Sequence, residues 1–180
     1  MATPITGTGS QVMDTSPTIT TPTLVNSDGT SIFVSHIKFC TTQFDATSGT
    51  TGTTLTNITG LTGFNLAAGK KYAFEVYLST VGTSNSGVKV AFKYSTLTLT
   101  SIEYRVLGTT ATGVAFSRGT TTTDQTTLFG ATTATLGVTI TGTLVVNAAG
   151  TLAVQAAQNA SHADTTSVFV GSWARFTRVG

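Results

Sequence analysis

The stretch TLGVTITGTLVVNAAGTLAVQAAQ, residues 135–158, decides the fold class of this chain. Its first half places apolar residues at every second position with threonine between them, which is the pattern of a β-strand with one buried face. The apolar row consists of Leu136, Val138, Ile140, Leu144 and Val146, with Gly142 in the same row. The alternation stops at residues 147–150 and restarts over residues 152–156. Two alternating runs across a short loop that ends in glycine predict a β-hairpin.

Shorter runs of the same kind recur along the rest of the chain, and no window of ten or more residues shows helical spacing. Threonine, a β-branched residue that favours strands, makes up roughly a quarter of the sequence. Strands are expected at residues 31–39, 63–66, 72–78, 88–94, 97–106, 113–118 and 165–179, with a bulge near Thr100 and Ser101 where the apolar register slips. This series predicts an all-β fold, a jelly-roll β-sandwich over residues 30–180 preceded by an extended N-terminal arm.

An internal similarity links two of these regions. The segment Leu66-Ala-Ala-Gly, which continues into a strand beginning at Tyr72, resembles Asn147-Ala-Ala-Gly, which continues into a strand beginning at Leu152. Two similar hairpins at distant places in the chain predict equivalent corners of a two-sheet sandwich. A chance match between short segments is the alternative.

Residues 1–29 form the expected arm. All three prolines lie here, and proline biases the preceding residue toward extended backbone. Apolar residues are sparse, so the segment cannot bury enough surface to fold alone. We expect the arm to order against a partner or against neighbouring copies of the chain, through Ile5, Val12, Met13, Ile19 and Leu24. A flexible tail is the alternative.

Two of the expected strands are apolar on both faces. Residues 165–179 place Val168, Val170, Ala174 and Phe176 on one face and Phe169, Trp173 and Val179 on the other, and residues 71–78 place Ala73 and Tyr77 behind the main row. A strand covered on one side is normally polar on the other. We therefore expect Tyr77, Phe169 and Trp173 to form a subunit interface. The alternative is that the arm folds back over them.

Charge and composition exclude several classes of function. The net charge is +2 and the nine basic residues are scattered, whereas a nucleic-acid surface needs them clustered. No apolar run approaches the roughly 20 residues of a membrane span, and the first residues lack the features of a signal peptide. The single Cys40 cannot form an internal disulfide, so synthesis in a reducing cytosol is expected.

Candidate metal and nucleophile motifs are weak. His36 and Cys40 are four positions apart, a spacing that does not converge on one side of a strand, and His162 is the other histidine. Asp14-Thr-Ser copies a triplet of aspartic proteases, but that chemistry needs two carboxylates inside a closed fold. We expect no metal and no cofactor.

Two further motifs favour structure over chemistry. Residues 82–89 nearly copy a phosphate-binding loop, but a valine precedes the lysine and no helix follows, which favours a turn. Glu75 and Glu103 are the only glutamates, and we expect them to pair with Lys89 and Lys93 across a sheet rather than to act in sugar hydrolysis. No catalytic residue is therefore predicted, and the chain is not expected to be an enzyme.

Residues 6–24, which run from Gly-Thr-Gly through Ser-Pro-Thr to Thr-Pro-Thr-Leu, resemble a recurrent segment of tailed-bacteriophage fibre proteins. Residues 61–78, 149–159 and 171–178 resemble the C-terminal jelly-roll modules of phage virion proteins, which are similar in plan to the trimeric tumour-necrosis-factor-like knob. A fibre normally has many shaft repeats and this chain has one. The resemblance therefore favours a short trimeric knob with an anchoring arm.

The resemblance implies a non-enzymatic virion structural protein, assembled in the host cytoplasm. The expected form is a homotrimeric capsid decoration protein or head fibre that the arm attaches to the major capsid protein or another virion protein. The alternative is a tail-fibre module that recognises host surface glycan through exposed aromatic residues and the loops at residues 41–54 and 119–133. No nucleic-acid or membrane partner is expected.

Overall fold

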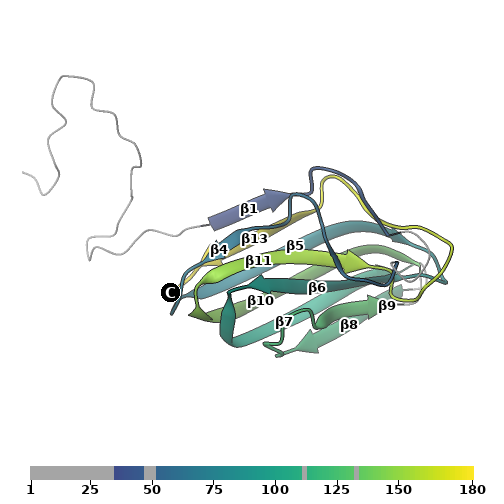
Figure 1. Ribbon diagram of the computed structural model, residues 1–180. Helices are drawn as coiled ribbons and strands as arrows, with labels where there is room; N and C mark the ends of the chain where they lie inside the picture. Colours follow the sequence, from purple (N-terminus) through teal and green to yellow (C-terminus); the bar gives the residue numbers. More distant parts are fainter. Residues whose placement is uncertain (1–34, 47–51, 111–112, 132–133) are drawn as a thin grey trace, which may run out of the picture. The chain divides into compact units, whose positions relative to one another are not determined.

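The computed structural model describes residues 35–46, 52–110, 113–131 and 134–180, so the expected arm, residues 1–29, lies outside the described residues. The described part consists of β-strands and contains no helix, which confirms the all-β prediction (Figure 1). It accordingly has no helix long and apolar enough to cross a bilayer. The strands are β1 (Ser35–Phe39), β2 (Phe44–Ala46), β3 (Thr56–Asn57), β4 (Phe64–Leu66), β5 (Lys71–Gly82), β6 (Val88–Ser95), β7 (Thr98–Thr110), β8 (Gly113–Gly119), β9 (Thr127–Ala131), β10 (Thr135–Ala148), β11 (Gly150–Ala157), β12 (Thr166–Val168) and β13 (Trp173–Arg178).

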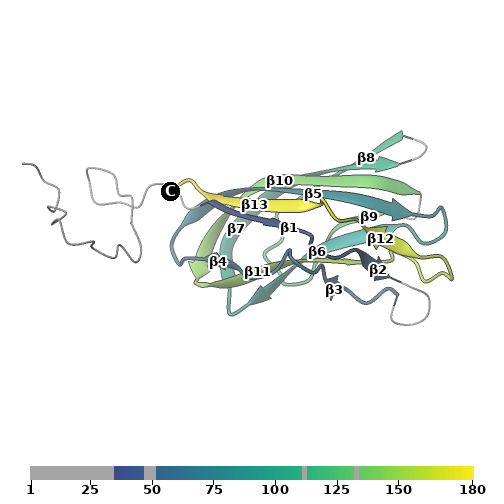
Figure 2. The same ribbon diagram turned by 90° about the horizontal axis from the view of Figure 1, so that it is seen from above.

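The strands form two antiparallel sheets. The eight-stranded sheet has the order β1-β13-β5-β10-β7-β8, with β12 paired to β5 and β2. The five-stranded sheet has the order β3-β11-β6-β9, with β4 also paired to β11. Figure 2 shows the two layers, with β13, β5 and β10 in one and β11 and β6 in the other.

The core lies between the two sheets. Every second residue of β5 is buried, from Tyr72 to Leu78, as the alternation predicted. Phe74 of the eight-stranded sheet meets Phe92 of the five-stranded sheet edge to face, with ring centroids 5.5 Å apart. Phe176 packs against both Phe64 at 4.7 Å and Phe92 at 5.9 Å. These rings join the layers because each one buries a large apolar surface against the opposite sheet.

Strand β10 follows the predicted pattern except at its start. Its apolar row is buried from Val138 to Val146, but Leu136 is 54% exposed and the preceding Thr135 is buried instead. A register shift between Thr135 and Gly137 explains why Leu136 is exposed, because a bulge moves the following side chains to the opposite face. A Cβ atom at Gly142 would lie 2.7 Å from the ring of the buried Phe74. Position 142 therefore faces the core together with the rest of the apolar row.

The predicted hairpin at residues 147–150 is wrong. Strand β10 is hydrogen-bonded to β5 on one edge and β7 on the other, so neither edge is free for β11. The chain instead crosses to the five-stranded sheet, where β11 pairs with β6, β4 and β3. The turn at residues 83–87 likewise joins strands of different sheets.

Both Ala-Ala-Gly segments are corners of the two-sheet sandwich, as predicted, but neither is a hairpin. Each segment carries the chain between sheets, one from β4 to β5 and the other from β10 to β11. The two corners lie side by side, since the Gly69 N–H donates to the Val146 carbonyl and the Val146 N–H to the Lys70 carbonyl, each at 2.9 Å. In addition, Gly150 is the register partner of Leu66.

Two further strand predictions are resolved by the pairing. The bulge expected near Thr100 is confirmed, because Val145 and Val146 of β10 face Ser101 and Leu99 with Thr100 left between them. The last strand is in fact two strands, β12 and β13. They are separated by a turn in which Gly171 has a φ of +99°, a conformation that favours glycine. Val170, expected on the buried face, lies in this turn and is 62% exposed.

Candidate functional site

The outer face of the eight-stranded sheet carries a row of aromatic side chains. Phe39 of β1 is the register partner of Trp173 of β13, which is in turn the partner of Tyr77 of β5. The rings of Tyr77 and Trp173 are 6.5 Å apart between centroids. Phe39 is 57% exposed and Tyr77 is 41% exposed. The aromatic row is therefore turned away from the core.

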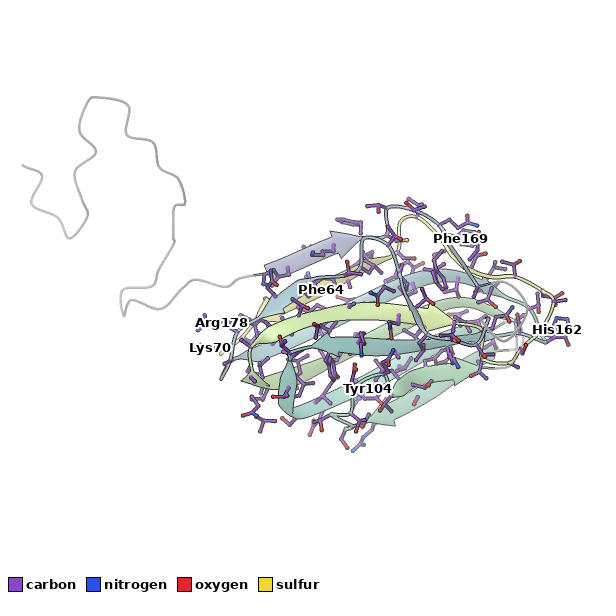
Figure 3. The ribbon with its side chains drawn as sticks, viewed as in Figure 1. Phe64, Lys70, Tyr104, His162, Phe169 and Arg178 are labelled. Carbon is purple, nitrogen blue, oxygen red and sulfur yellow. The ribbon has the colours of Figure 1, made fainter. Side chains whose placement is uncertain are left out.

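Two further residues extend this row into a patch. Ile37, two residues before Phe39 on the same face of β1, is 51% exposed. Phe169 follows β12, is 36% exposed, and its N–H donates to the Ser79 carbonyl of β5 at 2.9 Å. Ser79 lies two residues beyond Tyr77 on the same face of the strand. Ile37, Phe39, Tyr77, Phe169 and Trp173 are called the aromatic patch below; Figure 3 labels Phe169.

An ion pair borders the aromatic patch. The guanidinium of Arg175 donates to the Glu75 carboxylate at 3.0 Å and lies 6.0 Å from the Trp173 ring centroid. The two charged residues are cross-strand partners in the row next to the aromatic one. Opposite charges across a strand pair stabilise the sheet modestly, and a guanidinium near an indole face adds a cation–π contact.

The structure thus brings Tyr77 and Trp173 of the predicted interface into contact and places Phe169 beside the same strand. Sequence reasoning missed Phe39, although its alternation with His36 and Lys38 was visible. The apolar side of β1 faces outward because its register with β13 places Ile37 and Phe39 opposite the outward-facing Arg175 and Trp173. Its Lys38 turns inward over the edge of the core, where the ammonium donates to the Thr62 carbonyl at 2.7 Å and lies 5.5 Å from the Phe64 ring. The arm residues Ile5, Val12, Met13, Ile19 and Leu24 lie outside the described residues.

A second feature of the same face is a shallow pocket at the β7–β8 edge. Its volume is about 480 Å³, and it is lined by residues of β7, β8, β10 and the segment after β8: Glu103, Tyr104, Arg105, Arg118, Gly119, Thr120, Thr141, Gly142 and Thr143. Arg105 and Arg118 are direct register partners. The pocket therefore combines two guanidinium groups with threonine hydroxyls.

The predicted charge pairing of the glutamates is wrong. Glu75 pairs with Arg175, and Lys93 contacts the Asp124 carboxylate instead. Lys89 and Lys93 do not pair with Glu75 or Glu103, because both lysines belong to β6 in the other sheet. Glu75 and Glu103 lie on the outer face with β10 between their strands, which separates their strands by roughly 10 Å.

The histidines and the cysteine are not among the residues of the aromatic patch or the pocket, although His36 and Cys40 adjoin the patch residues of β1 in sequence. Burial, followed by the charge of Lys38, lowers the pKa of His36. Burial raises the pKa of Cys40, whose thiol donates to the Thr42 carbonyl at 3.1 Å. His162 pairs with Asp164 at 3.1 Å. In the parts of the chain that the structure describes, no three His, Cys, Asp or Glu residues are grouped as metal ligands would be.

The chain matches no protein-family model, and neither a curated protein nor a solved structure is significantly similar to it.

Proposed function

We propose that the protein is a homotrimeric structural component of a bacteriophage particle, a capsid decoration protein or head fibre attached through its N-terminal arm. The observation that carries the proposal is the aromatic patch. Large exposed aromatic residues gathered on one sheet face are typical of surfaces that bind another protein. The particle assignment itself is supported by the resemblance of residues 6–24 and of the three later segments to phage virion proteins.

The connectivity supports the jelly-roll part of the proposal. Consecutive strands change sheet repeatedly along the chain, for example between β4 and β5, β5 and β6, β6 and β7, and β10 and β11. Repeated crossing between two packed antiparallel sheets is a property of jelly rolls, an architecture found in viral capsid and lectin domains. Architecture alone does not identify a function, so the proposal depends on the surface as well.

Self-association through the patch would bring three arms together on one knob. Several weak contacts made by linked arms reinforce one another, because the first contact raises the effective concentration of the others. A symmetric trimer repeats one heterologous interface three times and closes on itself. The small number of charged residues, 9% of the chain, also suits dense packing of identical subunits.

Native mass spectrometry of the full chain tests self-association. We expect a mass of three times the 18.4 kDa chain. Tyr77→Ser combined with Trp173→Ser should shift the protein to monomer, since both side chains are proposed to be buried between subunits. Leu136→Ser is the matched control, because Leu136 is similarly exposed, at 54%, but lies outside the patch. A wild-type monomer, or an equal effect of the control, would refute self-association through the patch.

Deletion of residues 2–29 tests the arm. We expect the shortened protein to remain a trimer but to lose binding to the particle, because the deletion removes Ile5, Val12, Met13, Ile19 and Leu24. Particle binding is measured by co-sedimentation with particles that lack the protein. Full occupancy by the shortened protein would show that the arm is not the attachment segment.

A second candidate function is recognition of a host surface glycan. The observation that favours it is the pocket at the β7–β8 edge, which is lined by threonine residues and two arginines. A glycan array tests this function, and saturable binding to a defined structure would favour it over a purely structural role.

A further inference from the structure

The two arginines of the β7–β8 pocket are placed directly against each other. Arg105 and Arg118 are register partners in an antiparallel pair, and both are exposed. Side chains at such positions start about 5 Å apart, and like charges placed there destabilise a sheet. An arrangement with this cost is expected where an anion offsets it.

The other charged residues in the row of Arg105 and Arg118 are paired with each other. The row continues from Arg105 through Thr141 to Glu75 and Arg175, and the last two form an ion pair. Among the residues that the structure describes, the ion pairs involve Arg175, Lys93 and His162, whereas Arg105 and Arg118 have no carboxylate partner. The two guanidinium groups are therefore the unmatched part of the row.

The shape of the pocket follows from where β8 ends. The last residue of β8, Gly119, pairs with Tyr104, so the preceding residue of β7, Glu103, has no β8 neighbour. The resulting space of about 480 Å³ is larger than a single inorganic anion needs and falls within the range of small-molecule sites.

We propose that this pocket binds an acidic sugar, with its carboxylate held between Arg105 and Arg118 and its hydroxyl groups bonded to Thr120, Thr141, Thr143 and Glu103. Guanidinium groups bind carboxylates through paired hydrogen bonds, and threonine hydroxyls both donate to and accept from sugar hydroxyls. Glu103 accepts hydrogen bonds from hydroxyls and repels a second acidic group. The pocket thus favours a sugar with one carboxylate per ring over a densely charged polyanion.

The site names a ligand class for the second candidate function, glycan recognition, and rests on it. It does not rest on trimer formation, because the pocket on β7, β8 and β10 shares no residue with the aromatic patch on β1, β5, β13 and the segment after β12.

Titration calorimetry with the full chain tests the proposal, using a tetramer of galacturonic acid, a neutral glucose tetramer and inorganic phosphate as probes. We expect the acidic tetramer to bind saturably and more weakly as salt rises, because charge contributes to the contact. Arg105→Gln and Arg118→Gln should each weaken binding about tenfold or more, the usual loss for a hydrogen bond to a charged group. Arg178→Gln, which changes an arginine outside the pocket (Figure 3), should leave affinity within about twofold.

Thermal unfolding of the same variants separates binding from folding. Because each substitution removes half of a like-charge pair, Arg105→Gln and Arg118→Gln should keep or raise the melting temperature. The proposal is overturned if the acidic tetramer fails to bind, if the neutral tetramer binds equally well, or if phosphate alone binds as tightly. A lower melting temperature in both variants would also overturn it, by showing that the arginines support the fold. Binding of a neutral glycan that is insensitive to both variants would sustain glycan recognition while refuting this site.

Discussion

Gln158 organises the loops at one end of the molecule, and replacing it tests how that end is held. Its side chain is fully buried. The amide nitrogen donates to three backbone carbonyls, those of Ala46 at 3.3 Å, His162 at 3.2 Å and Asp164. The amide oxygen accepts the His162 N–H at 3.3 Å. One neutral amide therefore joins three segments: its own position after β11, the end of β2 at Ala46 and the loop at residues 162–164.

Two substitutions divide this role into hydrogen bonding and charge. Gln158→Met keeps the length of the side chain but removes two amide N–H donors and one acceptor, which at about 1 kcal/mol per hydrogen bond predicts a loss of about 3 kcal/mol. Gln158→Glu replaces the donor by a carboxylate facing the same carbonyl oxygens. Burial and this repulsion raise the pKa of the new carboxyl, so its charged form at pH 7 adds a further loss of stability.

The added loss depends on pH in a defined direction. Because the folded pKa of the new carboxyl is raised, the charge penalty is absent below its unfolded pKa of about 4.3 and grows as pH rises toward the folded value. Gln158→Glu should therefore lose clearly more stability at pH 7 than at pH 4, relative to wild type at each pH, while the loss for Gln158→Met should not change.

Urea unfolding followed by circular dichroism at pH 4 and pH 7 measures these differences. A loss below about 1 kcal/mol for Gln158→Met would refute the view that the amide holds the three segments together. Equal losses for the two variants at both pH values would refute the charge argument while leaving the hydrogen-bond argument in place.

Three further predictions concern the core. Gly142→Ala should cost about 2–3 kcal/mol in urea unfolding, because its Cβ would lie 2.2 Å from the Glu103 carbonyl oxygen; Gly137→Ala, whose nearest contact would be 3.5 Å away, should be nearly neutral. The Cys40 thiol is 1% exposed, and burial raises its pKa. It should therefore react with a disulfide reagent at pH 8 at least about 100-fold more slowly in the folded protein than in the unfolded protein. Rapid modification of the folded protein would contradict its burial. Burial, and after it the charge of Asp124, raises the pKa of Tyr94 far above its ordinary value. Alkaline absorbance titration should therefore show one tyrosine that ionises only when the protein unfolds, and this signal should be missing in Tyr94→Phe. Titration of every tyrosine in the folded wild type would contradict the prediction.

The face of most strand residues was predictable because a strand has a period of two. The alternation over residues 138–146 and 72–78 identified the buried side chains, and the slip near Thr100 located a bulge. The Ala-Ala-Gly repeat identified two corners, where glycine allows a φ of +70° at Gly69 and a close approach of chains at Gly150. At Gly150, for example, a Cβ atom would lie 2.2 Å from the Leu97 nitrogen.

The candidate site was predictable in part. Excess apolar character on the second face of two strands indicated Tyr77 and Trp173, which the structure places next to each other. Phe39 joins them only through pairing of β1 with β13, and Arg105 meets Arg118 only through pairing of β7 with β8. Residues so placed carry no mark in the sequence that distinguishes them from other exposed side chains.

The sequence by itself determined that the chain forms strands, which side of most strands is buried, and where two corners fall. Only the tertiary structure decided which strands are neighbours. The reason is physical: side-chain periodicity records burial, whereas the backbone hydrogen bonds that join strands are the same for every residue type except proline. Strand β10 shows the difference most clearly, since its pattern predicted a hairpin with β11 but both its edges bond β5 and β7.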